Sequence, residues 1–377
     1  MRAVVLVGGE GTRLRPLTFT TPKPLLPIGN IPFLERQLAW LSRHGVDEVV
    51  LALGYLPDAF AAHFPDGQFA TEVGTVRLRY TVEEEPLGTA GGIRYAADEA
   101  GIDERFVVCN GDVLTELDLS ALVRFHGQRA AEATIHLARV ADPSAFGLVP
   151  THGDGEVKAF VEKPPPGRAP TDWINAGTYV LEPSVLERIP PRLSVSIERE
   201  TFPRMLEVPG RLFAYQSDAY WLDIGTPEKY LQAHTDLLDG RLGADAFPAG
   251  AVERAPGVWM EGEVSVADDA GLESPTLVGA GSVFAPAARV SHSVLGAGCS
   301  VGEGARVVRS VLLDRARLEP GAQAADAVIG PDAVLEAGAI ARDQTVVGAG
   351  AVIAAGEAVS GARVERSGRL PGAPATR

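Results

Sequence analysis

Cysteine is scarce in this chain, and long hydrophobic runs are missing. The two cysteines among 377 residues are Cys109, inside an apolar run, and Cys299. We therefore expect a reducing compartment and no structural disulfide. The first apolar run, Ala3 to Val7, is only as long as a strand and leads into two glycines, so we interpret it as neither a secretory signal nor a membrane span. These features favour a cytoplasmic protein.

Basic charge is also scarce. The formal net charge of −15 at pH 7 leaves no broad basic surface for the phosphates of a nucleic acid. A phosphorylated ligand would therefore have to be small and held by a local site. Because 46% of the 377 residues are hydrophobic, we expect a folded protein with two compact domains rather than a disordered chain.

The first part of the chain alternates short β-branched runs with helix-length amphipathic segments. This alternation is typical of βαβ units around a mainly parallel sheet, which we expect to be mixed beyond Arg129. One helix is expected from Pro32 to His44, ending at Gly45, and another after the capping residue Thr226, with Pro227 in its first turn. Strands are expected at residues 2–7, 48–53, 76–81, 106–109, 133–140, 157–162, 174–181 and 212–216.

The last part of the chain carries a six-residue repeat. After a linker expected at residues 238–257, aliphatic residues recur every six positions, successive triplets lie 17 residues apart, and glycine often follows the aliphatic residue, as in Val278-Gly279. This period predicts a parallel β-helix with three short faces per coil, whereas a β-sandwich would show a period of two. The expected inward positions are 278, 284, 290, 295, 301, 307, 312, 318, 324, 334, 340, 346 and 352, and the expected domains are 1–240 and 258–365.

A Gly-rich loop follows the first expected strand. Gly8, Gly9 and Gly11 allow close backbone approach, and Arg13 and Lys23 supply cations, so the loop is suited to a polyphosphate. It is not a GxGxxG dinucleotide motif, because leucine stands at the third glycine position, and GxxxxGK is absent as well. Taken alone, the loop would fit a solvated turn equally well.

Two carboxylates occupy positions from which they could act together with this loop. Asp112 follows the apolar run Phe106 to Cys109, and ligands of open α/β sheets bind outside the carboxyl ends of the strands. Asp223 lies in the turn before the helix expected at Thr226. Two carboxylates and a triphosphate are a usual way for proteins to hold Mg²⁺, although each aspartate alone would fit an ordinary turn.

Two further segments suit the remaining parts of a nucleotide and a sugar phosphate. Lys163, after Glu162, could fix a monophosphate, and Asn175 is a polar residue inside an apolar run, where it needs a partner. The acids Glu83 to Glu85 precede a Gly-rich helix start and could accept from the N1–H and N2–H₂ edge of guanine, whereas uracil and thymine offer one such donor. Exposed turns and a solvated acidic loop are the alternatives.

Six motifs occur in order over nearly the whole chain. They are Gly-Gly-x-Gly-Thr-Arg-Leu-Arg-Pro-Leu-Thr with Pro-Lys-Pro, Glu-Glu-Glu-Pro-Leu-Gly-Thr-Ala-Gly, Asn-Gly-Asp-Val, Phe160 to Pro164, Ile174 to Gly177 and Trp221 to Gly225. Together they resemble the sugar-1-phosphate nucleotidylyltransferases and, among these, the mannose-1-phosphate guanylyltransferases. The resemblance implies an α/β fold: a Rossmann-like nucleotidyltransferase domain with a mixed, mainly parallel sheet, followed by a left-handed parallel β-helix of hexapeptide repeats.

The same resemblance implies Mg²⁺-dependent transfer of a guanylyl group from GTP to mannose 1-phosphate, giving GDP-mannose and pyrophosphate. Arg13 and Lys23 would be catalytic, and Asp112 and Asp223 would hold Mg²⁺. The nucleotide would bind Gly8, Gly9, Gly11, Thr12, Glu83, Gly88 and Asn110, with the choice among Glu83 to Glu85 open. The sugar phosphate would bind Gly147, Glu162, Lys163 and Asn175.

Other functions stay open from the sequence. The sugar could be a heptose or glucose 1-phosphate, and the nucleotide UTP or dTTP. A hexapeptide acyltransferase needs a histidine base, yet His292 is the only histidine after His234 and no long loop interrupts the repeat. A non-catalytic regulatory homologue would be expected to lack a loop cation or a metal carboxylate, and all four are present. The open ends and apolar faces of a solenoid favour a homo-oligomer.

Overall fold

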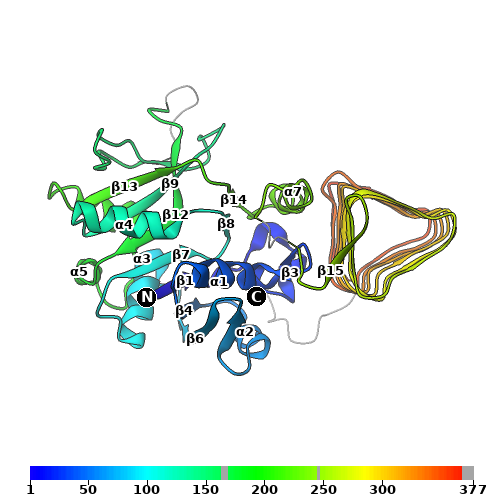
Figure 1. Ribbon diagram of the computed structural model, residues 1–377, viewed down its shortest axis with the longest axis horizontal. Coiled ribbons are helices and arrows are strands. Elements are labelled where there is room, and N and C mark those ends of the chain that lie inside the picture. Colours follow the sequence, from blue (N-terminus) through cyan, green and yellow to red (C-terminus); the bar gives the residue numbers. More distant parts are fainter. Residues whose placement is uncertain (163–168, 244–246, 367–377) are drawn as a thin grey trace, which may run out of the picture. The chain divides into compact units, whose positions relative to one another are not determined.

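The computed structural model describes residues 1–162, 169–243 and 247–366 (Figure 1). Its internal contacts group the chain into two units. Unit 1 consists of Met1–Glu10 and Phe33–Asp223, and unit 2 consists of Gly11–Pro32 and Ile224–Arg377. This grouping differs from the expected domains 1–240 and 258–365, because most of the Gly-rich loop and the helix after Thr226 group with the repeat region.

Unit 1 is built around a ten-stranded mixed sheet, as expected. The order along the sheet is β11-β10-β12-β7-β1-β4-β6-β5, with β9 beside β12 and β13 beside β9. Strands β1, β4, β6 and β7 are parallel, and β12 runs antiparallel to β7. The strands are β1 (Arg2–Leu6), β4 (Glu48–Leu53), β5 (Gln68–Thr71), β6 (Gly74–Val82), β7 (Phe106–Asn110), β9 (Ala133–Arg139), β10 (Gly147–Leu148), β11 (Val161–Glu162), β12 (Trp173–Leu181) and β13 (Leu212–Ser217).

The helices of unit 1 lie against this sheet (Figure 1). They are α1 (Phe33–Arg43), α2 (Pro57–His63), α3 (Gly88–Ala100), α4 (Leu119–Arg129), α5 (Ser184–Glu187) and α6 (Phe202–Met205). Ala3, Val4 and Val5 of β1 are fully buried, and all six residues of β4 are buried. Strands covered on both faces need apolar residues at consecutive positions, which explains the continuous apolar runs in the sequence.

Most of the expected elements of unit 1 are confirmed within a residue or two. The strand expected at 157–162 is wrong in its first part, since only Val161–Glu162 pairs in the sheet. Before it, Val157 forms an isolated bridge with Thr151, and Glu156 forms one with Phe213. These short bridges bend the segment, so the apolar run does not become one continuous strand.

In unit 2, the N-terminal loop packs against the repeat region. The loop contains short 3₁₀ turns at Thr12–Leu14, Leu17–Phe19 and Lys23–Leu25, then the small hairpin of β2 (Pro27–Ile28) and β3 (Ile31–Pro32). Asn30 Nδ2 donates to Glu261 Oε2 at 2.8 Å and to the Leu295 carbonyl at 2.9 Å. A Cβ at Gly348 would lie only 2.9 Å from Pro16 Cγ, so the glycine makes room for the proline.

Helix α7 (Pro227–Leu238) also belongs to unit 2 and begins as expected. Thr226 caps the helix by accepting a hydrogen bond from Lys229 N at 3.3 Å, and Pro227 fills the first turn. The buried Tyr230 then donates from its hydroxyl to the Pro27 carbonyl, which joins the helix to the loop. None of the helices in the described residues is long and apolar enough to cross a membrane.

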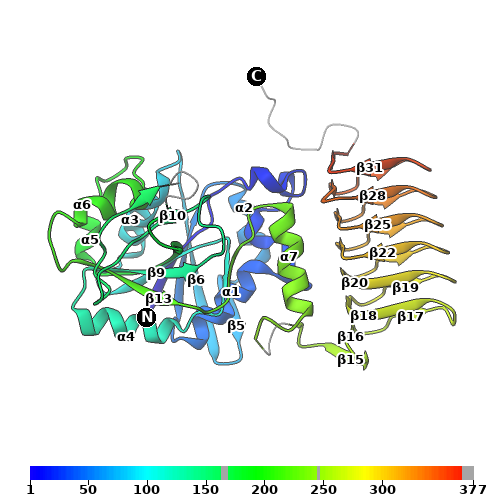
Figure 2. The same ribbon diagram turned by 90° about the horizontal axis from the view of Figure 1, so that it is seen from above.

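The rest of unit 2 is a parallel β-helix. Its coils superpose as a triangle in Figure 1 and appear as a stack from β16 to β31 in Figure 2. The strands are β15 (Ala251–Ala255), β16 (Val258–Glu261), β17 (Ser265–Val266), β18 (Gly271–Val278), β19 (Val283–Phe284), β20 (Arg289–Leu295), β21 (Ser300–Val301), β22 (Arg306–Val308), β23 (Val311–Leu312), β24 (Arg317–Leu318), β25 (Gln323–Ala325), β26 (Val328–Ile329), β27 (Val334–Leu335), β28 (Ile340–Arg342), β29 (Val346–Val347), β30 (Val352–Ile353), β31 (Ala358–Ser360) and β32 (Arg363–Val364). The expected linker is wrong at its end, because β15 pairs antiparallel with β16.

The expected inward positions are right up to residue 324 and wrong beyond it. Leu295 pairs with Leu312 and Leu312 with Ile329, which confirms the 17-residue offset. The buried cluster then continues through residues 335, 341, 347 and 353, one position after the expected 334, 340, 346 and 352. Val352 is 50% exposed. The step from Ala324 to Ile329 is five residues, and the inward positions after Ile329 follow at six-residue steps, which places them at 335, 341, 347 and 353.

One coil is longer than those before it. Val311 pairs with Val328, 17 residues on, but Val328 pairs with Val346, 18 residues on. Asp343 and Gln344 lie in the intervening corner, both with positive φ (55° and 64°). The extra residue is therefore absorbed in a corner, and the strands on either side keep their faces.

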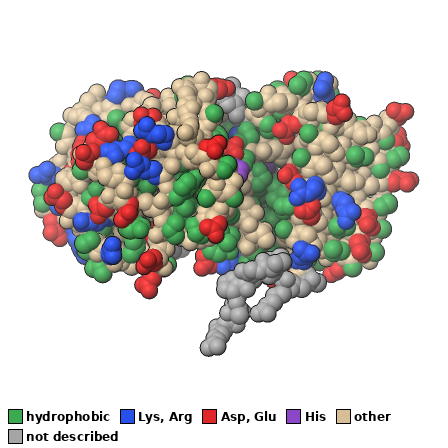
Figure 3. All heavy atoms as spheres, turned by 90° about the horizontal axis from the view of Figure 1, so that it is seen from below, with side chains coloured by type: hydrophobic (Ala, Val, Ile, Leu, Met, Phe, Trp, Pro, Cys, Tyr) green, Lys and Arg blue, Asp and Glu red, His purple; other side chains and the backbone are tan. Residues whose placement is uncertain are grey.

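Charged side chains of both signs cover the surface. On the face drawn in Figure 3, the described lysines and arginines lie among acidic residues rather than in one broad basic patch. On the β-helix, Arg309 binds Asp326 through two hydrogen bonds of 2.7 and 2.6 Å. Arg315 binds Asp332 in the same way at 2.7 and 2.8 Å. Each of these pairs joins residues 17 positions apart in neighbouring coils.

Candidate functional site

The carboxyl ends of β1 and β7 bring several predicted residues of unit 1 together. Leu6 of β1 lies opposite Asn110 of β7, so Gly8 and Gly9 leave the sheet beside the Asn-Gly-Asp turn. The Gly111 N–H donates to the Leu6 carbonyl at 2.9 Å, and a Cβ on Gly111 would lie 2.7 Å from that same oxygen. Gly111 is therefore needed for the two strand ends to approach so closely.

The two predicted metal ligands lie at one end of a strand pair, Asp112 just before β8 (Val113–Thr115) and Asp223 at the end of β14 (Trp221–Asp223). Strand β8 pairs antiparallel with β14, and Asp223 stands opposite Val113, the residue after Asp112. Both aspartates are half-buried. Hard carboxylate oxygens suit Mg²⁺, which keeps several waters and substrate oxygens in its shell. Among the described residues no group of three or more His, Cys, Asp or Glu could hold a metal ion.

The acidic loop is ordered by Glu83. Glu83 follows β6, and its Oε2 accepts from Leu87 N at 2.9 Å, just before α3. Burial raises the pKa of this carboxyl. A Cβ on Gly92 would lie 2.4 Å from Glu83 Oε1, so the glycine gives the carboxylate its space. Glu84 and Glu85 are exposed, which makes Glu83 the acid of this loop that is fixed against the protein.

The predicted sugar phosphate residues lie on three neighbouring strands. Gly147 of β10 pairs with Glu162 of β11, and Leu148 pairs with Ile174, the residue before Asn175 in β12. The side chain of Glu162 and the whole of Lys163 lie outside the described residues. The sheet register therefore brings the backbones of Gly147, Glu162 and Asn175 together.

A bulge in β12 holds Asn175. The pairing of β12 with β9 shifts between Asn175 and Tyr179. Asn175 Oδ1 accepts from Gly177 N at 3.0 Å, and its Nδ2 donates to Tyr179 Oη at 2.9 Å. Gly177 has a φ of +72°, and a Cβ there would lie 2.5 Å from Asn110 Nδ2. This glycine lets β12 approach the end of β7, so Asn175 and Asn110 come from adjoining parts of the sheet.

An aromatic pair beside these strands was missed from the sequence. Trp221 Nε1 donates to the Ala176 carbonyl at 2.9 Å, and its ring meets Phe146 edge-on with centroids 5.6 Å apart. Both rings pack against an apolar cluster that includes Ile174. The position of Phe146, one residue before the predicted Gly147, was the available signal.

Four of the predicted residues lie in the loop of unit 2, whereas Gly88 begins α3 in unit 1. Gly11 has a φ of +60°, and a Cβ there would lie 3.0 Å from Thr18 Cγ2 and 3.1 Å from Lys23 Cβ. Thr18 Oγ1 donates to the Gly11 carbonyl at 3.0 Å. This close turn brings together Gly11, Thr12, the exposed Arg13 and Lys23, which is only 7% exposed. The structure thus joins the two predicted cations in one loop.

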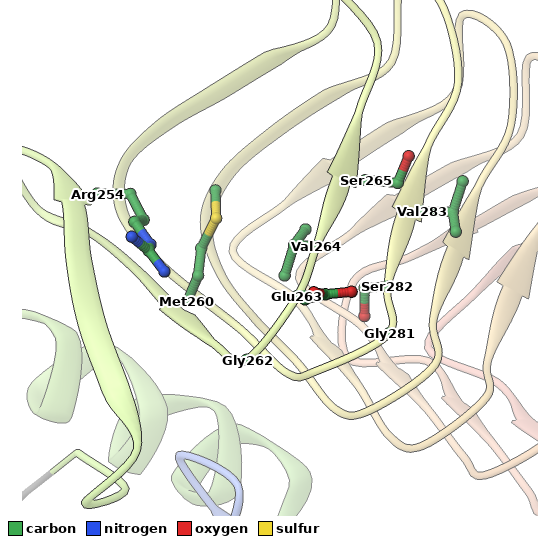
Figure 4. A pocket seen from close by; sticks show the side chains of 9 residues that line it. All are labelled: Arg254, Met260, Gly262, Glu263, Val264, Ser265, Gly281, Ser282 and Val283. Atoms are coloured by element: carbon green, nitrogen blue, oxygen red, sulfur yellow. The ribbon is translucent and has the colours of Figure 1, made fainter.

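A separate pocket in unit 2 contains none of the predicted residues. It has a volume of about 610 Å³ and lies at the first coils of the β-helix (Figure 4). Its lining includes Arg254, Met260 and Glu263.

Comparisons with known proteins agree with these motifs. A family model described as nucleotidyl transferase matches residues 2–240, and one described as GlmU-like, C-terminal hexapeptide matches residues 264–349. The chain is 42% identical over 289 residues to the mannose-1-phosphate guanylyltransferase of Mycobacterium tuberculosis, covering 76% of this chain and 77% of that protein. It is 39% identical over 282 residues to the probable mannose-1-phosphate guanylyltransferase 1 of Oryza sativa subsp. japonica, covering 74% and 75%.

Solved structures show the same relationship. Two crystal structures of HddC from Yersinia pseudotuberculosis are 31% and 32% identical to this chain, with TM-scores of 0.53 and 0.52. Each alignment covers 62% of this chain and 97% of the other, and the second structure is complexed with GMP-PN. Because the nucleotidyl transferase model spans well over half of the 377 residues, the chain belongs to the nucleotidyl transferase family.

Proposed function

We propose that this protein is a sugar-1-phosphate nucleotidyltransferase that transfers a guanylyl group from GTP to mannose 1-phosphate. The observation that supports the proposal is the register of β8 and β14, which pairs Asp223 with Val113, the residue after Asp112, beyond the carboxyl end of β7. The relatives of about 40% identity named as mannose-1-phosphate guanylyltransferases support the choice of substrates. The products are GDP-mannose and pyrophosphate.

The reaction needs alignment and charge stabilisation rather than a covalent nucleophile. An oxygen of the sugar phosphate attacks the α-phosphorus of GTP, and pyrophosphate leaves from the opposite side. We assign Arg13 and Lys23 to the triphosphate, where their positive charges offset the charge that develops on the leaving group. Lys23 is nearly buried, and such a cation acts more strongly than one in open solvent.

The two aspartates suit a divalent cation. Asp112 and Asp223 would hold Mg²⁺ with their carboxylate oxygens. When bound, the ion neutralises phosphate charge and helps to fix the triphosphate in line. The pairing of β8 with β14 fixes the backbone on which these aspartates stand.

The nucleotide is assigned to the Gly-rich turn, the acidic loop and the end of β7. Gly8, Gly9, Gly11 and Thr12 offer backbone N–H groups to phosphates, and Asn110 lies at the adjoining strand end. Glu83 would read the guanine edge as a double acceptor, with Gly88 leaving room for the base. Glu83 is the best candidate among the three acids because its carboxylate is held at the start of α3.

The sugar phosphate is assigned to the neighbouring strands. Asn175 would bind a sugar hydroxyl through its amide, and Gly147 would allow the ring to approach the backbone. Glu162 would accept from further hydroxyls, and Lys163 would bind the phosphate. These roles rest on the backbone register of β10, β11 and β12 and on the family resemblance.

The direct test is a matrix of nucleoside triphosphates and sugar 1-phosphates. Purified protein with Mg²⁺ is incubated with GTP, UTP, dTTP, ATP or CTP and with mannose, glucose or heptose 1-phosphate, and pyrophosphate release is followed. We expect the highest kcat/KM for GTP with mannose 1-phosphate. A higher value for another pair would move the assignment to that sugar or base, and no release in any mixture would reject the proposal.

We further propose a homo-oligomer, because exposed apolar residues such as Val252 (49% exposed) and Val283 (47% exposed) lie on the first coils of the β-helix. Light scattering after size-exclusion chromatography measures the mass directly. A mass near 39.6 kDa, that of one chain, would exclude an oligomer.

A further inference from the structure

One carboxylate of unit 1 connects two parts of the candidate site that the sequence left separate. Glu198 lies in a turn at Ile197–Thr201 and is half-buried. Its Oε2 accepts from Thr89 Oγ1 and from Ser196 Oγ, both at 2.9 Å. Its Oε1 accepts from Tyr179 Oη at 3.2 Å. Three hydroxyls from three segments therefore point at one side chain.

On one side, Glu198 fixes the orientation of Asn175. Tyr179 is fully buried, and burial together with the Glu198 charge raises its pKa well above the ordinary value, so its hydroxyl keeps the proton. That proton goes to Glu198, and the Tyr179 oxygen is thereby an acceptor for Asn175 Nδ2 at 2.9 Å. Since Gly177 N donates to Asn175 Oδ1, the amide has one orientation. Its second Nδ2 hydrogen has no acceptor among the described residues.

On the other side, Glu198 fixes the start of α3. Thr89 follows Gly88, and its hydroxyl accepts from Ile197 N at 2.8 Å, so it must donate to Glu198. The backbone adds two bonds, Val195 N to the Leu87 carbonyl and Ala90 N to the Val195 carbonyl, each 2.9 Å. The segment before Glu198 is thus joined directly to the loop that carries Gly88.

The fit between these segments leaves no free space. A Cβ on Gly88 would lie 2.7 Å from the Val195 carbonyl oxygen, and a Cβ on Gly91 would lie 2.4 Å from the Leu193 carbonyl oxygen. Movement at the start of α3 must therefore move residues 193–198 as well. Because Glu198 follows in the same segment, the movement reaches Tyr179 and Asn175.

We propose that Glu198 is a positioning residue that couples the nucleotide side of the site to the sugar phosphate side, so that each substrate binds more tightly when the other is present. The inference rests on the proposed function, because it takes Gly88 and Asn175 as contacts of different substrates. A ligand that fixes either side also fixes the shared carboxylate, and the second ligand then loses less conformational freedom on binding. Linkage requires the same coupling factor in both directions.

The test measures that factor by titration calorimetry on the full chain with Mg²⁺. The Kd of mannose 1-phosphate is measured with and without a GTP analogue whose α,β-bridge is methylene, and the Kd of the analogue with and without mannose 1-phosphate. We expect coupling of about five-fold or more in the wild type and about two-fold or less in Tyr179→Phe and Thr89→Val. The double variant should lose no more than either single one, because both break the same connection.

Two variants serve as matched controls. Tyr215→Phe removes a hydroxyl elsewhere in unit 1. Glu200→Gln neutralises a carboxylate in the same turn as Glu198. The Glu200 carboxylate accepts a hydrogen bond from Ser196 N at 3.1 Å but contacts neither Tyr179 nor Thr89. Both should keep wild-type coupling, and thermal melting confirms that every variant is folded.

The outcomes separate the inference from the proposed function. Three outcomes would overturn the role of Glu198 alone. The first is a wild-type protein that turns over its substrates but has a coupling factor of one. The second is unchanged coupling in folded Tyr179→Phe or Thr89→Val, and the third is an equal loss of coupling in Glu200→Gln. A wild-type protein that neither turns over nor binds these substrates would overturn both. Coupling lost in the two variants and kept in the two controls supports the inference.

Discussion

The two units of this molecule bring residues together in different ways. In unit 1, residues far apart in the sequence meet because the strands that carry them end at one edge of a sheet. Each of these contacts is made once and is not repeated elsewhere in the unit. In the β-helix of unit 2, residues of the parallel strands pair with residues 17 or 18 positions away, and similar contacts recur coil after coil. The comparison teaches that a substitution in unit 1 should remove a chemical role, whereas one in the β-helix should remove a fraction of its stability.

The largest expected effect is on turnover in unit 1. We expect Asp112→Asn to lower kcat by about 10²–10³-fold or more, because a neutral amide no longer balances the charge of a bound cation. The melting temperature should change little, since the substitution keeps the shape of the side chain. Pyrophosphate release and thermal melting are the measurements, and wild-type turnover in the variant would remove Asp112 from the metal site.

The next effect lies in the β-helix. Leu312 is fully buried in the row of inward residues, and Leu312→Ala should destabilise unit 2 by about 2–5 kcal/mol by leaving a cavity. Val352→Ala is the matched control, because that side chain is 50% exposed and should matter by about 0.5 kcal/mol or less. Hydrogen exchange read by mass spectrometry reports each unit separately. Equal effects at the two positions would contradict the observed phase of the repeat.

Acid should weaken unit 1 through His136. This residue is fully buried in β9, neither of its ring nitrogens has a hydrogen-bond partner among the described residues, and burial lowers its pKa to about 3. The unfolded chain takes up the proton near pH 6.5, so the stability that depends on neutral His136 is complete above that pH and is lost progressively between 6.5 and 3. From pH 8 to pH 5 the loss should reach about 2 kcal/mol.

His136→Leu should remove this part of the pH dependence. Urea unfolding at pH 8 and pH 5 gives the difference for both proteins, and the variant should show the smaller one. Some dependence will stay, because burial also lowers the pKa of His126, which the variant retains. An unchanged difference in the variant would mean that His136 is already protonated or hydrated in the folded state.

The smallest effect is expected at the surface of the β-helix. Arg309→Ala removes the paired hydrogen bonds to Asp326 and should lower stability by less than about 1 kcal/mol, with a smaller loss in 1 M salt. Arg309 has a φ of +45°, so Arg309→Gly should be less harmful than Arg309→Ala. The melting temperatures of the two variants decide the order, and a larger loss in the glycine variant would refute the strain argument.

Much of the fold was predictable where a local signal determines the structure. Gly45 and Thr226 are strong helix boundary signals, and α1 and α7 are found where they were expected. The phase of the last coils was not predictable from the six-residue period alone, because the step from Ala324 to Ile329 is five residues and the corner near Gln344 adds one residue to its coil.

The residues of the candidate site also fall into those that a local sequence signal predicts and those that it does not. Asp112 and Gly111 could be read from the end of an apolar run, since the strand itself delivers them to the sheet edge. Glu198 could not, because it lies in a short irregular turn whose neighbours, Thr89 and Tyr179, are about 109 and 19 residues away. The only hint was Tyr179, a hydroxyl inside an apolar strand that needed a buried partner.

The packing of Pro16 against Gly348 affects how the chain folds during its synthesis. The loop with Arg13 and Lys23 is synthesised near the start of the chain. Gly348, against which Pro16 packs, is synthesised roughly 330 residues later. At 5–20 residues per second this delay is about 20–70 s. Throughout that time Pro16 lacks its contact with Gly348. Other residues of the loop bind partners that are synthesised before Gly348, namely Tyr230, Glu261 and Leu295. The last contact of the loop that carries both cations is therefore made only after most of the β-helix has been synthesised.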